Sequence, residues 1–190
     1  AMINQINRLD LISNNLANSN THGFKQEGLS EGSFNNYLAK AEKNNVEPTQ
    51  LNTVLNTIPK IDTKYINNSQ GAVTPTSNPL DFAIVKEDVF FKIRSPEGET
   101  LLTRDGAFHK LDGFLVNGSG MQVLNADGEP IATEDNFGPL IAVSKTDYTN
   151  LERIGNNNYR ILNQEKVENI EGVNDDYVLQ SAIEHSNVNS

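Results

Sequence analysis

The residue types that most often carry chemistry are present in this chain, but their spacing does not suit a reactive centre. The three histidines, His22, His109 and His185, lie far apart in the sequence. Zinc sites usually bring two of their ligands from positions only a few residues apart, so a metal site built on these histidines is disfavoured. The chain has no cysteine, which excludes disulfides and thiolate ligands. We therefore expect no metal centre.

Acidic residues are numerous, with 25 Asp and Glu against 15 Lys and Arg. Some pair of carboxylates could reach the spacing of a glycosidase site, but any acidic chain offers such pairs. Asp105, Asp112 and Asp127 each precede a glycine, and a turn explains all three without catalysis. The sequence also lacks the Gly-x-Ser-x-Gly of a nucleophile elbow and the glycine-rich loops that bind phosphate. We expect no catalytic residue and no cofactor, so an enzyme is the least supported interpretation.

The charge and hydropathy of the chain exclude several classes of partner. A net charge of −10 argues against nucleic acid, whose phosphates require clustered Lys and Arg, and against an anionic membrane surface. The longest apolar runs, 82–85 and 140–143, are only four residues long. A transmembrane helix needs about 20 apolar residues and a secretory signal about 7–15. We therefore expect no membrane insertion and no cleavable signal peptide.

Residues 2–17 show a helical pattern, because apolar residues recur at steps of three and four. The apolar face has about one residue per turn, which is typical of a coiled-coil seam. A helix of this length is marginal alone, so we expect this face to need a partner. Gly23, after the helix, can supply a positive φ that turns the chain. The apolar stripe comprises Met2, Ile6, Leu9 and Leu16, with Ile12 or Ser13 between the last two.

The long segment over residues 26–70 has no sustained hydrophobic period. It contains a run at 33–41 that could form a helical turn and strand-like runs at 53–58 and 60–66. We interpret residues 26–70 as an extended linker.

From residue 71 the pattern changes to short runs rich in Val, Ile, Leu and Phe, separated by turn signals. The Asp-Gly pairs predict hairpins, because both residues can adopt positive φ at low cost. Residues 130–143 are expected to add two further strands, 149–162 are weaker, and 176–183 could be strand or helix. The fold class is therefore mainly β, with one compact all-β domain over 71–165. The predicted strands lie at 81–84, 89–94, 100–104, 107–110, 114–117 and 122–124.

Three strings in the sequence resemble one protein family. Residues 13–25 are similar to the amino-terminal signature of the flagellar axial proteins, the rod and hook proteins. Residues 78–84, 90–91, 103–108 and 113–116 resemble the start of the β-domain of those proteins. The string 183–189 resembles the motif that leads into their carboxy-terminal helix. The site residues that the resemblance implies are Asn14, Asn15, Leu16, Ala17, Asn18, Asn20, Thr21, Gly23, Phe24, Lys25, Ser186, Asn187, Val188 and Asn189.

The resemblance implies an organisation in four segments. Residues 1–25 would contribute to an inner coiled-coil core, and 26–70 would form the extended linker. Residues 71–165 would form the β-domain, and 166–190 a return segment that leads to a carboxy-terminal helix. Compared with the family pattern, we expect both terminal helices to be truncated in this sequence.

The resemblance further implies a structural role, and the rod proteins of proximal or distal type fit it best. Such a subunit polymerises helically with itself and with other rod and hook proteins, inside surrounding ring proteins, as the drive shaft that transmits torque for motility. It would lie in the periplasm-spanning basal body and leave the cytoplasm through the flagellar type III export route, without a cleavable signal.

Two other functions stay open at this point. One is a hook or hook-like flagellar subunit. The other is a soluble all-β module that binds carbohydrate or cell-wall polymer, for which exposed aromatic residues should converge on one groove. Phe82, Phe108, Phe114 and one of the pair Phe90-Phe91 instead fall inside the strand-like runs, where a core would need them.

Overall fold

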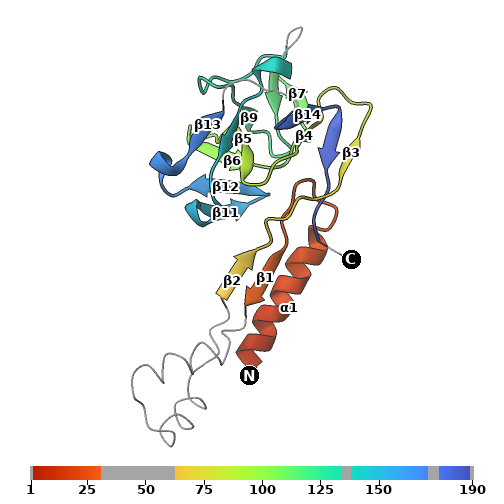
Figure 1. Cartoon of the computed structure of the whole chain (residues 1–190), viewed down its shortest axis with the longest axis vertical. Helices are drawn as coiled ribbons and strands as arrows, with labels where there is room; N and C mark the ends of the chain where they lie inside the picture. The colour runs from red at the N-terminus through yellow and green to blue at the C-terminus, as the bar shows by residue number, and fades with distance from the viewer. Residues whose placement is uncertain (1, 31–62, 134–137, 171–175, 189–190) are drawn as a thin grey trace, which may run out of the picture. The chain divides into compact units, whose positions relative to one another are not determined.

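The computed structural model describes residues 2–30, 63–133, 138–170 and 176–188 (Figure 1). These residues form one α-helix and fifteen short strands, which confirms the prediction of a mainly β fold with an amino-terminal helix. The contacts divide the chain into two compact units. The first comprises Ala1–Asn15 and Glu27–Asn67, and the second Leu16–Gln26 and Asn68–Ser190.

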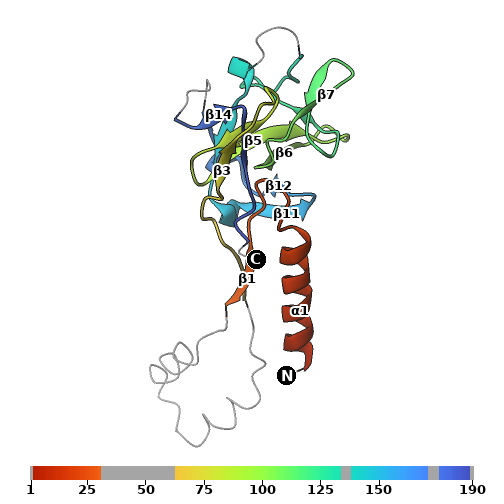
Figure 2. The ribbon, with the colours of Figure 1, turned by 90° about the vertical axis from the view of Figure 1, so that its right-hand side faces the viewer.

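The first unit consists of most of helix α1 (Met2–Ala17) and a two-stranded ribbon. The bounds of α1 match the predicted helix, and Figure 2 shows it as a single straight helix. The ribbon pairs β1 (Glu27–Ser30) with β2 (Thr63–Ile66) in antiparallel register. These strands lie within the segment that we interpreted as an extended linker. Its other predicted elements, at 33–41 and 53–58, lie outside the described residues.

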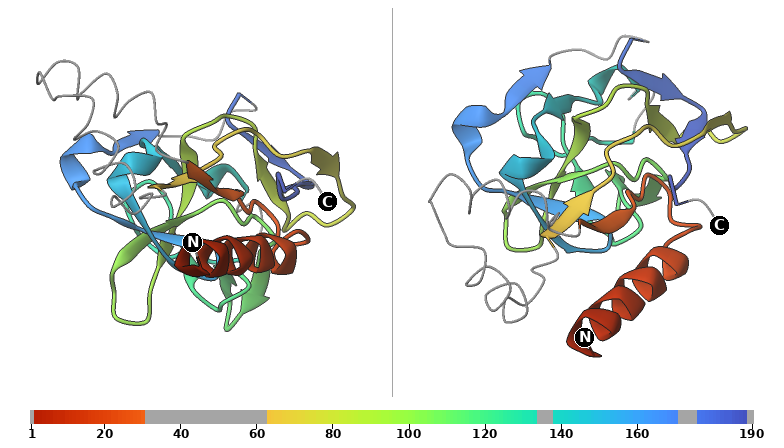
Figure 3. Two further views of the ribbon diagram at one scale, coloured as in Figure 1. Left: turned by 90° about the horizontal axis from the view of Figure 1, so that it is seen from below. Right: turned by 60° about the horizontal axis from the view of Figure 1, so that its bottom comes forward.

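The second unit is built on a nine-stranded antiparallel sheet. The main path of the sheet runs in the order β11-β12-β6-β5-β9-β8-β7, and β10 joins it by pairing with both β5 and β13. Figure 3 shows the strands of this unit arranged around a common interior. The strands are β5 (Val89–Arg94), β6 (Thr100–Thr103), β7 (His109–Leu111), β8 (Phe114–Val116), β9 (Gln122–Val123), β10 (Val143–Lys145), β11 (Leu151–Gly155), β12 (Asn158–Ile161) and β13 (Glu168–Ile170).

Two further strand pairs complete the second unit. β14 (Val178–Gln180) pairs with β4 (Phe82–Ile84), and β15 (Ala182–Glu184) pairs with β3 (Val73–Pro75). The segment 176–183, left open between strand and helix, is therefore two short strands with Ser181 between them at φ 56°. Three 3-10 turns also occur among the described residues, η1 (Gly138–Leu140), η2 (Tyr148–Asn150) and η3 (Gln164–Lys166).

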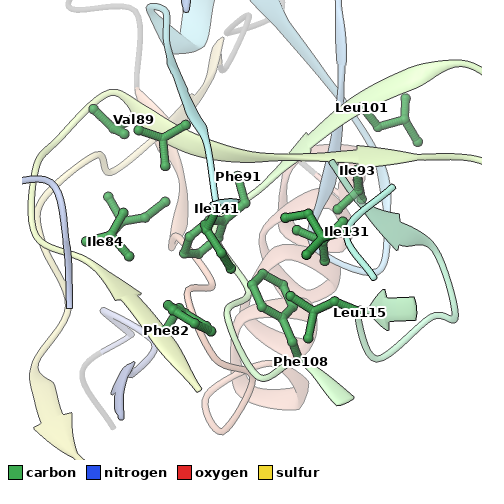
Figure 4. Packing of buried hydrophobic residues seen from close by; sticks show 13 residues of the cluster. Phe82, Ile84, Val89, Phe91, Ile93, Leu101, Phe108, Leu115, Ile131 and Ile141 are labelled. Carbon is green, nitrogen blue, oxygen red and sulfur yellow. The ribbon is translucent and has the colours of Figure 1, made fainter. Parts of the chain in front are cut away.

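β5 lies at the centre of the sheet and is buried on both faces. It pairs with β6 along one side and with β10 and then β9 along the other. Side chains alternate along a strand, so Phe91 points into the main core whereas Phe90 points to the opposite face. Figure 4 shows Phe82, Phe91 and Phe108 converging in that core. The core cluster comprises Phe82, Ile84, Val89, Phe91, Ile93, Leu101, Phe108, Leu115, Val123, Ile131, Ile141, Val143 and Val178.

Phe90 belongs to a second, aromatic cluster with Tyr148 and Tyr159. The three rings meet edge to face, with centroids 5.0 to 5.8 Å apart. Both members of the Phe90-Phe91 pair are therefore buried, where the sequence analysis placed one of them in the core. Phe114 is only half-buried and lines an open groove of about 370 Å³.

The Asp-Gly pairs behave in two different ways. Asp112 and Gly113 join β7 to β8 with φ of 51° and 83°, which confirms the predicted hairpin. The hairpin predicted at Asp105-Gly106 is wrong, because β6 and β7 do not pair there. Gly106 is needed for a different reason, since a Cβ at this position would lie 1.7 Å from the backbone oxygen of Phe82. Burial raises the pKa of Asp105, although its Oδ1 accepts a hydrogen bond from the backbone N–H of Ala107.

The prediction of two further strands over 130–143 is also wrong for the residues that the structure describes there, 130–133 and 138–143. Pro130 and Ala132 make only isolated bridges, and a 3-10 turn precedes β10. Within the described part of the chain, no helix is long and apolar enough to cross a membrane.

Candidate functional site

The helix α1 exposes one apolar face. Ile6, Leu9, Ile12 and Leu16 are 52 to 65% exposed although their side chains are large and aliphatic. They recur at steps of three and four, so they share one side of the helix. These are residues of the predicted apolar stripe, and Ile12 is its apolar member between Leu9 and Leu16. The side chain of Met2 lies outside the described residues.

A different face of α1 is buried within the first unit. Leu11 is 7% exposed, and Asn15, one turn further on, is equally buried. The Asn15 side chain donates from Nδ2 to the backbone oxygen of Glu27 at 2.7 Å and accepts from the Glu27 N–H at 3.0 Å. The amide thus binds the first residue of β1 as a neighbouring strand would. The sequence analysis placed Asn15 in the signature but missed Leu11, because it considered a single apolar face.

Two turns follow the end of α1. The backbone oxygen of Asn18 accepts from the N–H of Thr21 at 3.0 Å, and the Thr21 hydroxyl donates to the Asn18 side chain at 3.2 Å. The N–H of Phe24 then donates to the backbone oxygen of Thr21 at 3.2 Å. The other signature residues in this stretch, Asn14, Ala17 and Asn20, are exposed.

Gly23 is held against the sheet of the second unit. Its φ is 64°, as the sequence analysis predicted for a chain reversal, and its N–H donates to the backbone oxygen of Glu184 at 2.8 Å. A Cβ at this position would lie 2.4 Å from the backbone oxygen of Arg104. Both the conformation and the close approach therefore require glycine.

Three charged side chains meet inside the second unit. Lys25, Arg104 and Glu184 are each only 1% exposed. The Nζ of Lys25 lies 2.8 Å from Oε1 of Glu184, and Nη2 of Arg104 lies 2.7 Å from Oε2. Each oxygen of the carboxylate thus serves one cation. We call these three residues the buried triad.

Arg104 is fixed by several acceptors besides Glu184. Its Nη1 donates to the backbone oxygens of Lys86 and Val89, both at 2.9 Å. Its Nη2 donates to the side-chain oxygen of Gln70 at 3.1 Å. A buried guanidinium with these partners has a single orientation and remains charged.

Glu184 is the acceptor that joins the triad to the backbone. Its Oε1 accepts from Gln70 Nε2 at 2.6 Å and from the N–H of Gly71 at 3.0 Å, in addition to Lys25. Lys25 has a second acceptor, the backbone oxygen of Ser69, at 2.8 Å. A buried charge is tolerated only when it is paired and hydrogen-bonded, and these contacts meet that condition.

The electrostatics of the triad are unbalanced, because two cations share one carboxylate. Burial, and next the Arg104 guanidinium, lower the pKa of Lys25 below its ordinary value of 10.5. The charge of Glu184 and its hydrogen bond oppose this shift. Lys25 and Arg104 therefore repel each other, and Glu184 holds them together.

Phe24 docks beside the aromatic cluster of the second unit. It is 3% exposed, and the guanidinium carbon of Arg153 lies 4.6 Å from its ring centroid and 5.4 Å from that of Tyr159. Nη2 of Arg153 donates to the backbone oxygen of Lys25 at 3.0 Å. The guanidinium thus binds both the ring and the backbone of the signature.

Asn187 connects the carboxy-terminal string to the amino-terminal signature. Its Oδ1 accepts from the N–H of Gln26 at 2.7 Å, and its own N–H donates to the backbone oxygen of Phe24 at 3.2 Å. Its Nδ2 donates to the backbone oxygen of Ser69 at 2.9 Å. The neighbours Ser186 and Val188 are half-buried, and Asn189 lies outside the described residues.

The structure thus joins parts of all three family-like strings in one place. Lys25 comes from the first string, Arg104 from the second and Glu184 from the third. Arg104 and Glu184 lay inside the strings, but the sequence analysis gave them no role. A charged residue two positions after the apolar pair Leu101-Leu102 was the available clue to Arg104.

Two of the three histidines lie next to each other. His22 and His185 meet edge to face with ring centroids 6.0 Å apart, and His109 is exposed on β7. Nε2 of His185 shares a hydrogen bond with the Thr74 hydroxyl at 2.8 Å. Among the residues that the structure describes, no three His, Asp or Glu side chains are placed to hold a metal ion.

Two family models match this sequence. "Flagella basal body rod protein" matches residues 1–25, and "Flagellar hook protein FlgE/F/G D1 domain" matches residues 84–152. Lys25 is the last residue of the first match, and Arg104 lies within the second.

Curated relatives carry the same descriptions. The flagellar basal-body rod protein FlgF of Mesorhizobium japonicum is 34% identical over 133 residues, covering 70% of this chain and 49% of the relative. The rod protein FlgG of Agrobacterium fabrum is 32% identical over 162 residues, covering 80% and 57%. The flagellar hook protein FlgE of Brucella abortus is 30% identical over 129 residues, covering 67% and 30%. The chain spans about half the length of the rod proteins it matches.

Proposed function

Because the chain belongs to the family of flagellar basal-body rod and hook proteins, we propose that it is a structural subunit of the flagellar rod. Its role is mechanical, since it transmits torque as part of the axial drive shaft, and it has no catalytic role. Rod proteins FlgF and FlgG, at 34% and 32% identity, favour the rod over the hook, whose matched protein shares 30% over a smaller part of its length.

The observation that carries this proposal is the exposed apolar stripe of α1. Four large aliphatic side chains on one helix face lose a favourable burial of roughly 1.5–3 kcal/mol each while they face water. In a helical polymer they pack against helices of neighbouring subunits, with about one residue per turn at the contact. Contacts of this kind that do not close into a ring produce a helical tube.

In this proposal each segment keeps the role that its sequence suggests. Residues 1–25 join the inner core, 26–70 link it to the outer part, 71–165 form the outer β-domain, and 166–190 return towards the core. The partners are further copies of the chain, other rod and hook proteins, and the surrounding ring proteins. The subunit reaches the periplasm through the flagellar export route.

A complementation experiment in the source bacterium tests the proposal. A strain without the gene receives either the unchanged gene or a variant with Ile6, Leu9 and Ile12 replaced by Gln. We expect the unchanged gene to restore swimming and complete rods in electron micrographs of basal bodies, whereas the variant restores neither. Leu162→Gln is the matched control, because Leu162 is 61% exposed but lies outside α1. Normal rods in the stripe variant, or normal motility of the deletion strain, would contradict the proposal.

A further inference from the structure

We propose that Glu184 makes the docking of the signature segment, residues 23–26, conditional on the placement of β15 near the other end of the sequence. The carboxylate pairs with both Lys25 and Arg104 and opposes the repulsion between these two cations. The segment then docks only when the carboxy-terminal strand is already in place. This docking is a property of the isolated chain, whereas its consequence for assembly depends on the proposed function.

Arg104 is first of all a preformed cation. Its Nη1 hydrogen bonds go to the backbone oxygens of Lys86 and Val89, near the start of β5, and involve neither the signature segment nor β15. Before β15 is placed, a folded sheet therefore presents a fixed positive charge where Lys25 must dock. Burying a second cation beside it is unfavourable, because like charges repel strongly away from water.

The second step is that Glu184 opposes this repulsion. Lys25 and Arg104 bind different oxygens of the same carboxylate, at 2.8 and 2.7 Å. Burial and Arg104 lower the pKa of Lys25, and Glu184 acts in the opposite direction. The docked segment is thus stabilised by one acidic side chain that lies 159 residues away in the sequence.

The third step is that the backbone of the signature segment also depends on Glu184 and on the residues that follow it. Gly23 donates to the backbone oxygen of Glu184, Gln26 donates to the side chain of Asn187, and Asn187 donates to the backbone oxygen of Phe24. In the described residues β15 has only the three-residue strand β3 as a strand partner. Residues 184–187 and the signature segment therefore stabilise each other, and neither has extensive strand pairing of its own.

Contacts of such large sequence separation form late in folding, because a long loop must close before they contribute. A chain that lacks an ordered β15 would thus leave the segment directly after α1 undocked. For a subunit that polymerises through α1, this would separate complete chains from incomplete ones before assembly.

Hydrogen exchange of the full chain, followed by mass spectrometry, tests the inference on four forms: unchanged, Glu184→Gln, Lys25→Met and the double variant. We expect Glu184→Gln to speed exchange across residues 23–26 by at least about tenfold, while β5 stays protected. We expect Lys25→Met alone to speed exchange as well. In the double variant, however, Lys25→Met should slow exchange relative to Glu184→Gln alone, because it removes the cation that Arg104 repels.

The reversal of sign separates this inference from a simple loss of hydrogen bonds. If the double variant exchanges as fast as Glu184→Gln or faster, the inference is wrong, as it is if Glu184→Gln leaves the segment protected. If Glu184→Gln unfolds the whole chain, the same reversal must appear as a higher stability of the double variant than of the single one. Glu99→Gln is the matched control, because Glu99 makes an exposed ion pair with Arg160. All measurements use the isolated chain, so they do not depend on whether it forms rods.

Discussion

The apolar stripe of α1 and the buried triad depart from the usual distribution of side chains in opposite directions. On α1, Leu9 and Leu16 are more than 60% exposed. In the triad, two cations and a carboxylate are almost completely buried. Both arrangements are costly for an isolated chain unless a partner compensates them.

The difference between them lies in where that partner is. Each member of the triad finds its partners within the chain, at hydrogen-bonding distance. The stripe has no such cover in the described structure, so under the proposed function its partner is another subunit. Variants in the triad should therefore change stability, and variants in the stripe should change assembly.

The largest loss of stability is expected for Arg104→Met. This change removes the buried donor of Oε2 of Glu184 and of several backbone oxygens, so the free energy of unfolding should fall by about 3–5 kcal/mol. Urea denaturation of the purified chain measures it. Arg160→Met removes an equally close but exposed ion pair and should cost far less, because water screens the attraction between exposed charges. Equal losses of unfolding free energy for the two variants would show that burial does not increase the contribution of the triad to stability.

A smaller but clear loss is expected for Gly23→Ala. The left-handed conformation alone costs an L-residue roughly 1–2 kcal/mol, and overlap of the new Cβ with the Arg104 backbone oxygen adds to it. Gly98 also has a positive φ, but a Cβ at that position would meet no atom within 4 Å. Gly98→Ala therefore measures the conformational cost alone. In thermal denaturation, Gly23→Ala should have a lower melting temperature than Gly98→Ala. The reverse order would argue against close docking of the signature.

Asn15→Ala tests the buried face of α1. The change removes both hydrogen bonds to Glu27, so we expect a loss of about 1–3 kcal/mol within the first unit. Hydrogen exchange of peptides that cover β1 should report it locally. Asn20→Ala, at an exposed signature residue, should stay within about 0.5 kcal/mol of the unchanged chain. Unchanged hydrogen exchange of the β1 peptides in Asn15→Ala would contradict the role that we assign to the Asn15 amide.

The pH dependence of stability should reveal the lowered pKa of Lys25. Its pKa is lowered in the folded chain, so between that value and 10.5 the unfolded chain binds a proton that the folded chain has released. The free energy of unfolding contributed by this group therefore rises with pH across that window. Comparing denaturation curves of the unchanged chain and of Lys25→Met isolates the effect, since Lys92, whose pKa is also lowered, is present in both. A contribution that falls with pH would show that Glu184 outweighs burial and Arg104.

The smallest effect on stability is expected in the stripe itself. Leu9→Gln replaces an exposed side chain, so the free energy of unfolding should change by no more than about 0.5 kcal/mol. Thermal denaturation of the purified chain measures this. A loss of several kcal/mol would mean that Leu9 is covered within the chain, and the contrast with the triad would fail.

Local patterns in the sequence predicted the features that depend on local physics. Periodicity defined α1, and the predicted strand at 89–94 matches β5. Asp112-Gly113 forms a hairpin because the turn requires only that these two residues adopt positive φ, which is a local property. The prediction failed at Asp105-Gly106, where the glycine is required by contact with Phe82.

Features that depend on long-range contacts could not be read from the sequence. Nothing local shows that Lys25 meets a carboxylate 159 residues away. Leu11 was missed for a related reason, since only its surroundings distinguish it from the exposed leucines of the same helix. The resemblance located the strings that meet at the triad, but the pairing itself required the structure.

The most direct test of the central claim uses the absence of cysteine from the chain. A single Leu9→Cys substitution provides a unique thiol on the stripe, and its reaction with a maleimide can be followed in the purified chain and in isolated basal bodies. We predict rapid labelling of the purified chain and strong protection in basal bodies that contain the variant. Equal labelling in both would contradict the claim that the stripe is covered by neighbouring subunits.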